Sequence, residues 1–286
     1  MRRVIVNADD FGLTRGVNEA VRKAHSDGVL TSTTVLVNGS HAAEAADLPR
    51  TWPDLGVGIH VNLSRGRSSS PPEEVPSLVD ADGTFFTRMA LFRRLVRGQI
   101  RREEVFKEVS SQILALRGLG VEPTHWDAHE SIAFWPGLRG PTATAAYAAG
   151  LRRVRTPRVW IVESGREPRV ARRRWRRSRA RRWLTDANRV AAHVSLSRQF
   201  HRPGWLVSPN LVVGGDYAFR WRAALSSLPP GVSEVVSHPG YVDAELRAAE
   251  PGLVDDRAID LAALLQPAVR NWLRDQEATL ISFRDL

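Results

Sequence analysis

The fold is decided by one stretch near the start of the chain, Val4-Ile5-Val6-Asn7-Ala8-Asp9-Asp10-Phe11-Gly12. Its β-branched residues predict a buried strand, and two adjacent carboxylates follow where that strand ends. Two like charges beside a core are costly unless a metal ion offsets one of them and a catalytic proton neutralises the other. The stretch therefore predicts a chemically active edge at the end of the first strand.

The rest of the chain alternates between strand and helix patterns. Thr14 is suited to cap a helix that ends at Gly28, and a long loop is expected over residues 64–88. Further strands are expected at 30–38, 56–63, 121–128, 206–213, 232–237 and 280–283, and helices at 41–48, 103–119 and 258–274. This alternation predicts an α/β fold with a parallel sheet or barrel, in a single domain over residues 1–286.

Composition narrows the chemistry. The chain contains no cysteine, so disulfides and thiolate metal sites are excluded, and any metal must be held by His, Asp, Glu or water. The sequence shows neither a signal-peptide pattern nor an apolar run long enough to cross a bilayer. A cytoplasmic enzyme is the expectation.

The net charge of +10 is a local feature. Residues 166–182 contain ten arginines and one glutamate, so nearly all of the excess lies within an inserted basic helical segment at about 160–205. The preferred interpretation is a solvated basic helix. A lid or dimer contact over the pocket is the main alternative, while Trp175 and Trp183 would suit contact with a membrane surface. No nucleic-acid motif accompanies the charge.

Four segments place Asp or His where a strand is expected to end. Strand ends meet at one edge of a parallel sheet, so these side chains are expected to converge. Asp10, His60 and His125 could bind a divalent ion and leave room for water and substrate. Asp9 could take the proton of that water, and His238 could protonate a leaving amine.

Two further groups belong to the third segment. Asp127 or His129 could hold a ligand imidazole in the required tautomer, because alternate residues share one face of a strand. Trp126 and Trp135 flank the same segment, and an aromatic face there could support a sugar ring or simply fill the core.

The motifs resemble those of the YdjC-like carbohydrate deacetylases. The resemblance is carried by Asn7-Ala8-Asp9-Asp10-Phe11-Gly12-Leu13, Gly16-Val17-Asn18, Gly58-Ile59-His60-Val61-Asn62-Leu63, Ser77-Leu78-Val79-Asp80, Pro123-Thr124-His125-Trp126-Asp127-Ala128-His129, Ser237-His238-Pro239-Gly240-Tyr241-Val242-Asp243, Arg257 and Leu280-Ile281-Ser282-Phe283-Arg284. These motifs span most of the chain apart from roughly 160–205. One departure is that Ser131 and Ala133 stand where the family has further histidines, which bears on the choice of substrate.

The resemblance implies a distorted (β/α) TIM-like barrel that removes acetyl groups from N-acetylated sugars with a divalent metal, Mg²⁺ or alternatively Zn²⁺. It assigns metal binding to Asp10, His60 and His125, the base to Asp9 and a pocket position to His238. Asn62 and Arg257 are expected to support the ligands or to contact the substrate. A homodimer is the expected assembly.

Three other functions stay open on the sequence. The substrate could be an N-acetylated glycolipid, with the basic segment against a membrane. The chain could instead be a metal-dependent phosphoesterase, or an amidase acting on non-sugar substrates. It could also be a catalytically silent binding protein. Release of acetate from an N-acetylated sugar and binding of a divalent ion would separate these alternatives.

Overall fold

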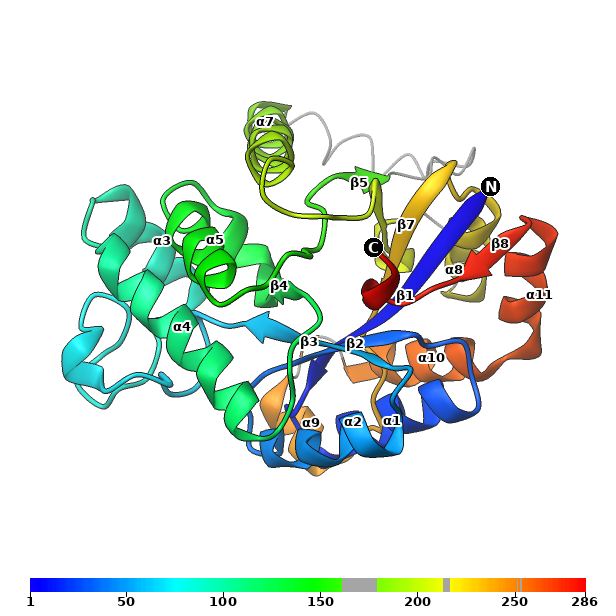
Figure 1. Ribbon diagram of the computed structural model, residues 1–286, viewed down its shortest axis with the longest axis horizontal. Helices are drawn as coiled ribbons and strands as arrows, with labels where there is room; N and C mark the ends of the chain where they lie inside the picture. Colours follow the sequence, from blue (N-terminus) through cyan, green and yellow to red (C-terminus); the bar gives the residue numbers. More distant parts are fainter. Residues whose placement is uncertain (161–178, 213–216, 251, 253) are drawn as a thin grey trace.

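The computed structural model describes residues 1–160, 179–212, 217–250, 252 and 254–286. Within them an eight-stranded parallel sheet curls into a half-barrel with helices around it (Figure 1). The strands are β1 (Arg2–Phe11), β2 (Ser32–Val35), β3 (Gly56–Val61), β4 (Trp126–Ala128), β5 (Val159–Trp160), β6 (Trp205–Val207), β7 (Gly231–Ser237) and β8 (Ala278–Leu280). The expected distorted (β/α) barrel is thus confirmed.

Strand β1 is the centre of the sheet. The order is β4-β3-β2-β1-β7-β6-β5, and β8 pairs with the first residues of β1. Residues 4–11 are buried throughout, as expected for a strand with neighbours on both sides and helices beyond them. Because β1 carries the carboxylate pair, the sheet delivers Asp9 and Asp10 to its middle.

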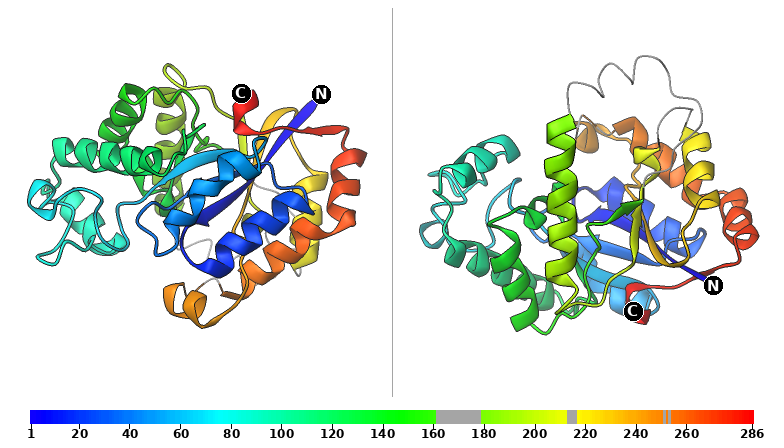
Figure 2. Two further views of the ribbon diagram at one scale, coloured as in Figure 1. Left: turned by 60° about the horizontal axis from the view of Figure 1, so that its bottom comes forward. Right: turned by 90° about the horizontal axis from the view of Figure 1, so that it is seen from above.

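The helices follow the strands in alternation. They are α1 (Arg15–Ser26), α2 (Leu48–Thr51), α3 (Arg88–Val96), α4 (Arg102–Gly118), α5 (Arg139–Ala148), α7 (Arg179–Leu196), α8 (Tyr217–Ser226), α9 (Ala244–Ala249), α10 (Val254–Leu265) and α11 (Pro267–Asp275). The Thr14 hydroxyl accepts from the Val17 N–H and caps α1, as expected. Helices α1 and α10 lie side by side over the sheet, while α3, α4 and α5 gather beyond β4 (Figure 2).

Several sequence expectations need correction. The strands expected at 30–38 and 206–213 are only β2 and β6, and the strand expected at 280–283 is β8, which ends at Leu280. The single helix expected at 258–274 is two helices, because Pro267 begins α11 and cannot continue the hydrogen bonding of α10. Residues 41–48 form mostly a 3₁₀ helix, η1 (Ala42–Asp47), ahead of the short α2. The strand expected at 121–128 begins only at Trp126.

The loop after β3 is fixed by buried polar side chains on one face of α4. The carboxylate of Glu108 accepts the backbone N–H groups of Ser69 and Ser70, each at 2.9 Å. Gln112 accepts the Asn62 N–H at 3.0 Å and donates to the Asn62 carbonyl at 2.6 Å. The long loop therefore leaves the sheet in a defined direction.

The basic segment falls partly outside the described residues. Trp175 and the stretch 161–178 lie outside them, and for Trp183 only the helical backbone of α7 is described. Among the described helices, none combines the length and the apolar character that crossing a bilayer requires.

Candidate active site

A β-bulge in β1 turns the carboxylate pair toward one place. Ala8 pairs with Thr33 but Phe11 pairs with Val35, so β1 holds one extra residue between these pairs. Asp10 sits in the bulge with a φ of 70°, which is strained for a residue with a side chain. In a regular strand the two side chains would point to opposite faces, and the bulge removes that alternation.

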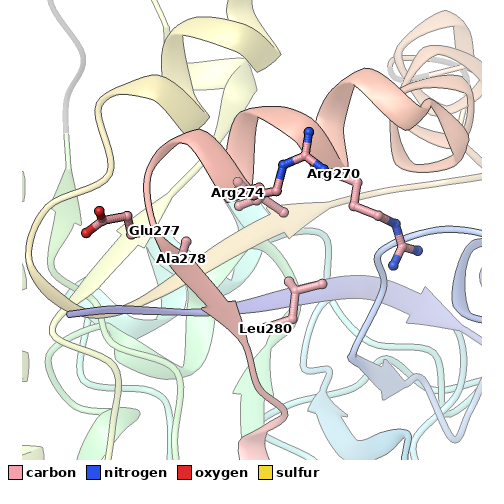
Figure 3. A pocket seen from close by; sticks show the side chains of 6 residues that line it. Arg270, Arg274, Glu277, Ala278 and Leu280 are labelled. Carbon is pink, nitrogen blue, oxygen red and sulfur yellow. The ribbon is translucent and has the colours of Figure 1, made fainter.

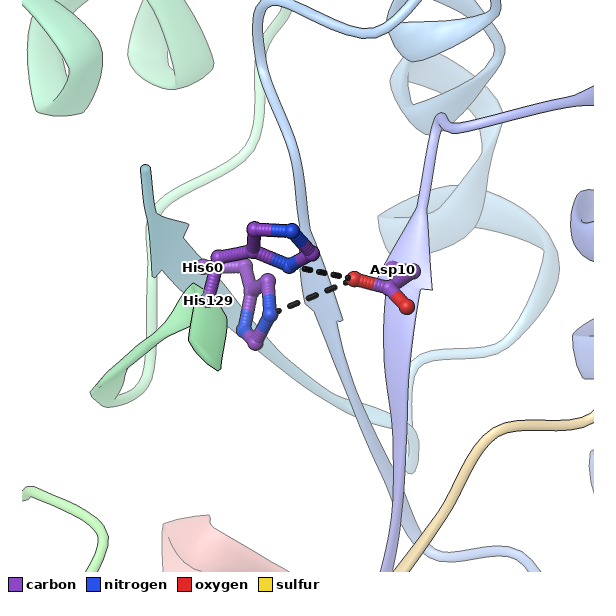
Figure 4. Close-up of side chains that lie close together, drawn as sticks. All are labelled: Asp10, His60 and His129. Atoms are coloured by element: carbon purple, nitrogen blue, oxygen red, sulfur yellow. Dashed lines mark hydrogen bonds and ion pairs between the residues drawn. The ribbon is translucent and has the colours of Figure 1, made fainter. Parts of the chain in front are cut away.

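Asp10 forms the centre of a cluster with two histidines. Its Oδ1 lies 3.3 Å from Nε2 of His60 and 3.1 Å from Nδ1 of His129 (Figure 4). Its Oδ2 accepts a 2.6 Å hydrogen bond from the fully buried Arg257. Burial would raise the pKa of Asp10, but Arg257 and the two histidines hold it well below its usual value. Asp10 is therefore ionised, with one oxygen directed at both rings.

His60 is oriented by groups on the neighbouring strands. Its Nδ1 lies 2.6 Å from Asp127 Oδ1 and 3.1 Å from the Thr34 hydroxyl. These contacts leave Nε2 facing Asp10. Burial lowers the pKa of His60, but the surrounding carboxylates, Asp127 foremost, outweigh burial and raise it to about 10. A divalent cation at Nε2 would satisfy the same negative surroundings as a proton does.

Asp9 is held by a second buried arginine. Both oxygens of Asp9 accept from Arg155, at 2.6 and 2.7 Å, and Oδ1 also accepts from the Asn7 side chain at 2.9 Å. Burial alone would raise the pKa of Asp9, yet Arg155 keeps it far below the usual range. Arg155 also contacts Asp127 and Glu234, so one guanidinium joins three carboxylates.

His238 faces Asp9 from the end of β7. Its Nε2 lies 3.7 Å from Asp9 Oδ2, and its side chain is 24% exposed. The backbone N–H of His238 donates to Asp260 at 2.8 Å, which fixes the turn after the strand. Burial lowers the pKa of His238 below its ordinary value, and the nearby carboxylates only partly oppose this. A neutral imidazole next to the carboxylate is ready to receive a proton.

The structure does not bring His125 to this cluster. The His125 ring is fully buried and stacks on Phe283, with ring centroids 3.7 Å apart, while Gly58 leaves the space that it fills. Its Nδ1 is 2.8 Å from the Thr124 hydroxyl, and burial lowers its pKa well below the ordinary value. The second histidine of the cluster is His129 instead. Residues 125, 127 and 129 share one face of the strand, and only the last lies beside Asp10.

Two other expected site residues also lie away from the cluster. The Asn62 side chain donates to the Asn38 side chain and to the Arg65 carbonyl, so it shapes the turn after β3. Trp126 is fully buried against Phe134 and Phe200, which makes it a core residue and no platform for a sugar. Trp135, by contrast, is only partly buried.

Sequence reasoning missed four buried groups that support the site. Arg155 was hidden by the abundance of arginine, although it follows directly on a strand-like run that ends at Val154. Thr34 stands in an expected strand and gave no separate signal. Glu234 and Asp260 are the other two. Glu234 alone could have been found from the sequence, because a carboxylate inside an apolar strand indicates a buried and paired charge.

A separate hollow lies between α11 and β8. Figure 3 shows its lining, which is Arg270, Leu273, Arg274, Glu277, Ala278 and Leu280. Because β8 pairs with residues 2–4 at the start of β1, this hollow is at the opposite end of that strand from Asp9 and Asp10.

Known proteins resemble this chain in sequence and in fold. A carbohydrate deacetylase of Geobacillus stearothermophilus is 30% identical over 99% of this chain and 98% of its own length. A chitooligosaccharide deacetylase of Serratia marcescens is 38% identical over 52% of this chain and 57% of its own. A solved structure from Enterococcus faecalis, whose name assigns it to cellobiose-phosphate cleavage, shares the fold with a TM-score of 0.76, at 23% identity over 99% of this chain and 98% of that one. The family model described as YdjC-like protein matches residues 3–275, and the chain belongs to that family.

Proposed function

We propose that this protein is a metal-dependent deacetylase that removes acetyl groups from N-acetylated sugars. The observation that carries the proposal is the convergence of Asp10, His60 and His129, with Asp9 and His238 beside them. The names of the full-length relatives support the substrate class. A carboxylate base, a neutral imidazole and a metal-ligand cluster are the groups that amide hydrolysis requires.

The donor set fits a divalent ion. Asp10, His60 and His129 each direct one ligand atom into a space where these atoms lie within 4.8 Å of one another. One carboxylate and two imidazoles suit Zn²⁺ better than Mg²⁺, because Mg²⁺ prefers oxygen ligands. When bound, the ion supplies Lewis-acid polarisation of the amide carbonyl and of the attacking water. A second group, Asp9 with His60 and Asp127, fits less well because Arg155 already contacts both carboxylates.

The roles of Asp9 and His238 follow from their charge states. Asp9 is ionised and accepts the proton of the attacking water as the new C–O bond forms. Because Arg155 stabilises its anionic form, Asp9 is a weak base and releases that proton readily. Neutral His238 lies next to it, receives that proton from Asp9 and delivers it to the amine nitrogen as the C–N bond breaks. The products are acetate and the free amino sugar.

The remaining residues hold these groups in place. Arg257 takes Oδ2 of Asp10 and so leaves only Oδ1 for the ion. Asp127 holds Nδ1 of His60, which fixes Nε2 as the ligand atom. Thr34 donates to the other oxygen of Asp127 at 3.1 Å.

The deciding experiment measures acetate release. The purified protein is stripped of metal, reloaded with Zn²⁺, Mg²⁺ or Co²⁺, and incubated with N-acetylglucosamine, its β-1,4 oligomers and a generic phosphoester. We expect metal-dependent acetate release and no phosphate release. Phosphate release without acetate would replace the proposal with a phosphoesterase, and failure to bind any divalent ion would favour a silent binding protein.

A further inference from the structure

The exposed rim beside the metal-ligand cluster suggests where the rest of a longer substrate lies. We call this rim, made of Ser64, Arg88, Phe92, Glu130 and Trp135, the Trp135 rim. It lies where the chain leaves β3, which carries His60, and β4, which His129 follows directly. The Ser64 hydroxyl donates to Glu130 Oε2 at 3.0 Å, and Arg88 lies 3.6 Å from Glu130 Oε1.

The backbone of the rim is strained where it leaves the cluster. Glu130 and Ser131 follow His129 with φ values of 50° and 57°, and neither is glycine. Both side chains are exposed, so their own packing does not explain this conformation. Two consecutive left-handed residues cost free energy and are found mainly where function retains them. Here they turn the Glu130 carboxylate outward next to the ligand His129.

The aromatic part of the rim is the second observation. Trp135 is partly buried, Arg88 lies over its ring at 5.6 Å from the centroid, and Phe92 packs edge-on against it at 5.7 Å. Phe92 is 47% exposed and its neighbour Met89 is 57% exposed. Carbohydrate rings bring apolar C–H faces together with hydroxyl groups, so they suit aromatic rings bordered by a carboxylate and a guanidinium.

The buried side of the cluster cannot take a second ring. Arg155, Arg257 and Asp127 close the space behind Asp9 and Asp10, and each is at most 4% exposed. On the open side, the exposed Glu130 follows His129 directly and contacts Ser64 and Arg88, so the Trp135 rim begins next to the cluster. We propose that this rim binds the sugar ring next to the one being deacetylated, so that Trp135 sets a preference for oligosaccharides over the monosaccharide. This inference rests on the proposed deacetylase function.

The test compares kcat/KM for N-acetylglucosamine and its β-1,4 disaccharide in the metal-loaded protein. We expect the wild type to prefer the disaccharide, and Trp135→Ala to reduce the disaccharide-to-monosaccharide ratio about tenfold, mainly through KM. Trp135→Phe should restore most of the ratio. Trp52→Ala removes another partly buried tryptophan, in the turn before β3 at the amino end of the sheet, and should preserve it.

Several results would overturn the inference. One is an equal loss on both sugars in Trp135→Ala, which would mean that Trp135 only supports the fold. Another is an unchanged ratio together with dissociation of an oligomer on size-exclusion chromatography, which would make the rim a contact between copies. If the wild type releases no acetate at all, the proposed function fails, and calorimetric titration with the disaccharide still decides whether Trp135 binds it.

Discussion

At the scale of single residues, Asp9 and Asp10 are adjacent in sequence yet held by different arginines. Arg155 takes both oxygens of Asp9, whereas Arg257 takes one oxygen of Asp10 and leaves the other for the histidines. The two carboxylates are thereby given different chemistry. In the proposed mechanism one is the base and carries no metal, and the other is a metal ligand.

Replacing Asp9 by Asn tests that division. Asp9→Asn should lower kcat by about 10²–10⁴-fold, the usual contribution of a general base, while the protein still binds its divalent ion. Acetate release and calorimetric metal titration measure the two effects separately. Near-normal turnover would remove Asp9 from the role of base. Glu19→Gln, at an exposed helix position, serves as the control and should leave both quantities unchanged.

The choice between His125 and His129 has its own test. His129→Gln should weaken divalent-ion binding at least about 100-fold, because it removes a ligand from the cluster. His125→Gln should leave the affinity within a few-fold but destabilise the fold, because its ring fills the space between Gly58 and Phe283. Metal titration and thermal unfolding distinguish the pair. The reverse pattern would return His125 to the ligand set.

This choice also marks the limit of sequence reasoning at the site. Asp9, Asp10, His60, Asp127 and His238 could be placed at one edge because each lies at the end of a strand whose pattern is local. The ligand from the third segment could not be chosen, because alternation gives residues 125, 127 and 129 the same face. The selection depends on the turn at Glu130 and Ser131, whose left-handed backbone no propensity predicts.

At the scale of elements, prediction succeeded where apolar periodicity was strong. Helix α1 and strands β1, β3 and β7 were anticipated with small errors at their ends. Helix α3 was not anticipated, because Leu91 is its only buried residue and its sequence therefore shows no clear apolar periodicity. The split of α10 from α11 depended on Pro267, which the pattern of apolar residues obscured.

Helix α4 offers a prediction about the long loop. Glu108→Leu would leave the N–H groups of the partly buried Ser69 and the buried Ser70 without their acceptor. We expect a loss of about 2–4 kcal/mol in the free energy of unfolding, since each unsatisfied buried donor costs roughly 1–3 kcal/mol. Urea denaturation measures it. Glu103→Gln, exposed on the same helix, should change the free energy of unfolding by less than about 0.5 kcal/mol. Equal losses in the two variants would show that the bonds from Glu108 to the loop do not stabilise the fold.

At the scale of the whole molecule, the interior of the half-barrel collects carboxylates from several strands and helices. Glu234 on β7 and Asp260 on α10 are fully buried. Burial raises the pKa of each to about 7, and the neighbouring carboxylates add to the effect. Asp9 and Asp10 shift in the opposite direction because Arg155, which bonds both oxygens of Asp9, and Arg257, which bonds Asp10, outweigh burial there. The pH dependence of stability is therefore the sum of opposing contributions.

The sign follows from linkage. A carboxyl group whose pKa is raised in the folded state stabilises the protein most when it is protonated. Its stabilising contribution is complete below about pH 4, the ordinary pKa of a carboxyl group. The contribution is lost as pH rises through about 7, the pKa in the folded state. The contributions of Asp9 and Asp10 are complete above pH 4 and are lost only in acid. Between pH 5 and 7 Asp9 and Asp10 no longer contribute to the slope. Glu234 and Asp260 make metal-free protein less stable as pH rises there, while His125 and His238, whose pKa values burial lowers, contribute in the opposite direction.

Glu234→Gln isolates this effect. Oε1 of Glu234 accepts from Arg155, which the amide oxygen can also do, while Oε2 is buried and finds no partner among the described residues. The variant should remove the contribution of Glu234, so that the slope of unfolding free energy against pH between 5 and 7 becomes more positive by up to about 1.4 kcal/mol per pH unit, the limit for one proton. Urea denaturation of metal-free protein across pH 5–8 measures the slope, with the exposed Glu19→Gln as the control. A slope identical to that of the wild type would mean that Glu234 is ionised throughout. The three carboxylates around Arg155 would then all be charged, and a single guanidinium would have to balance them.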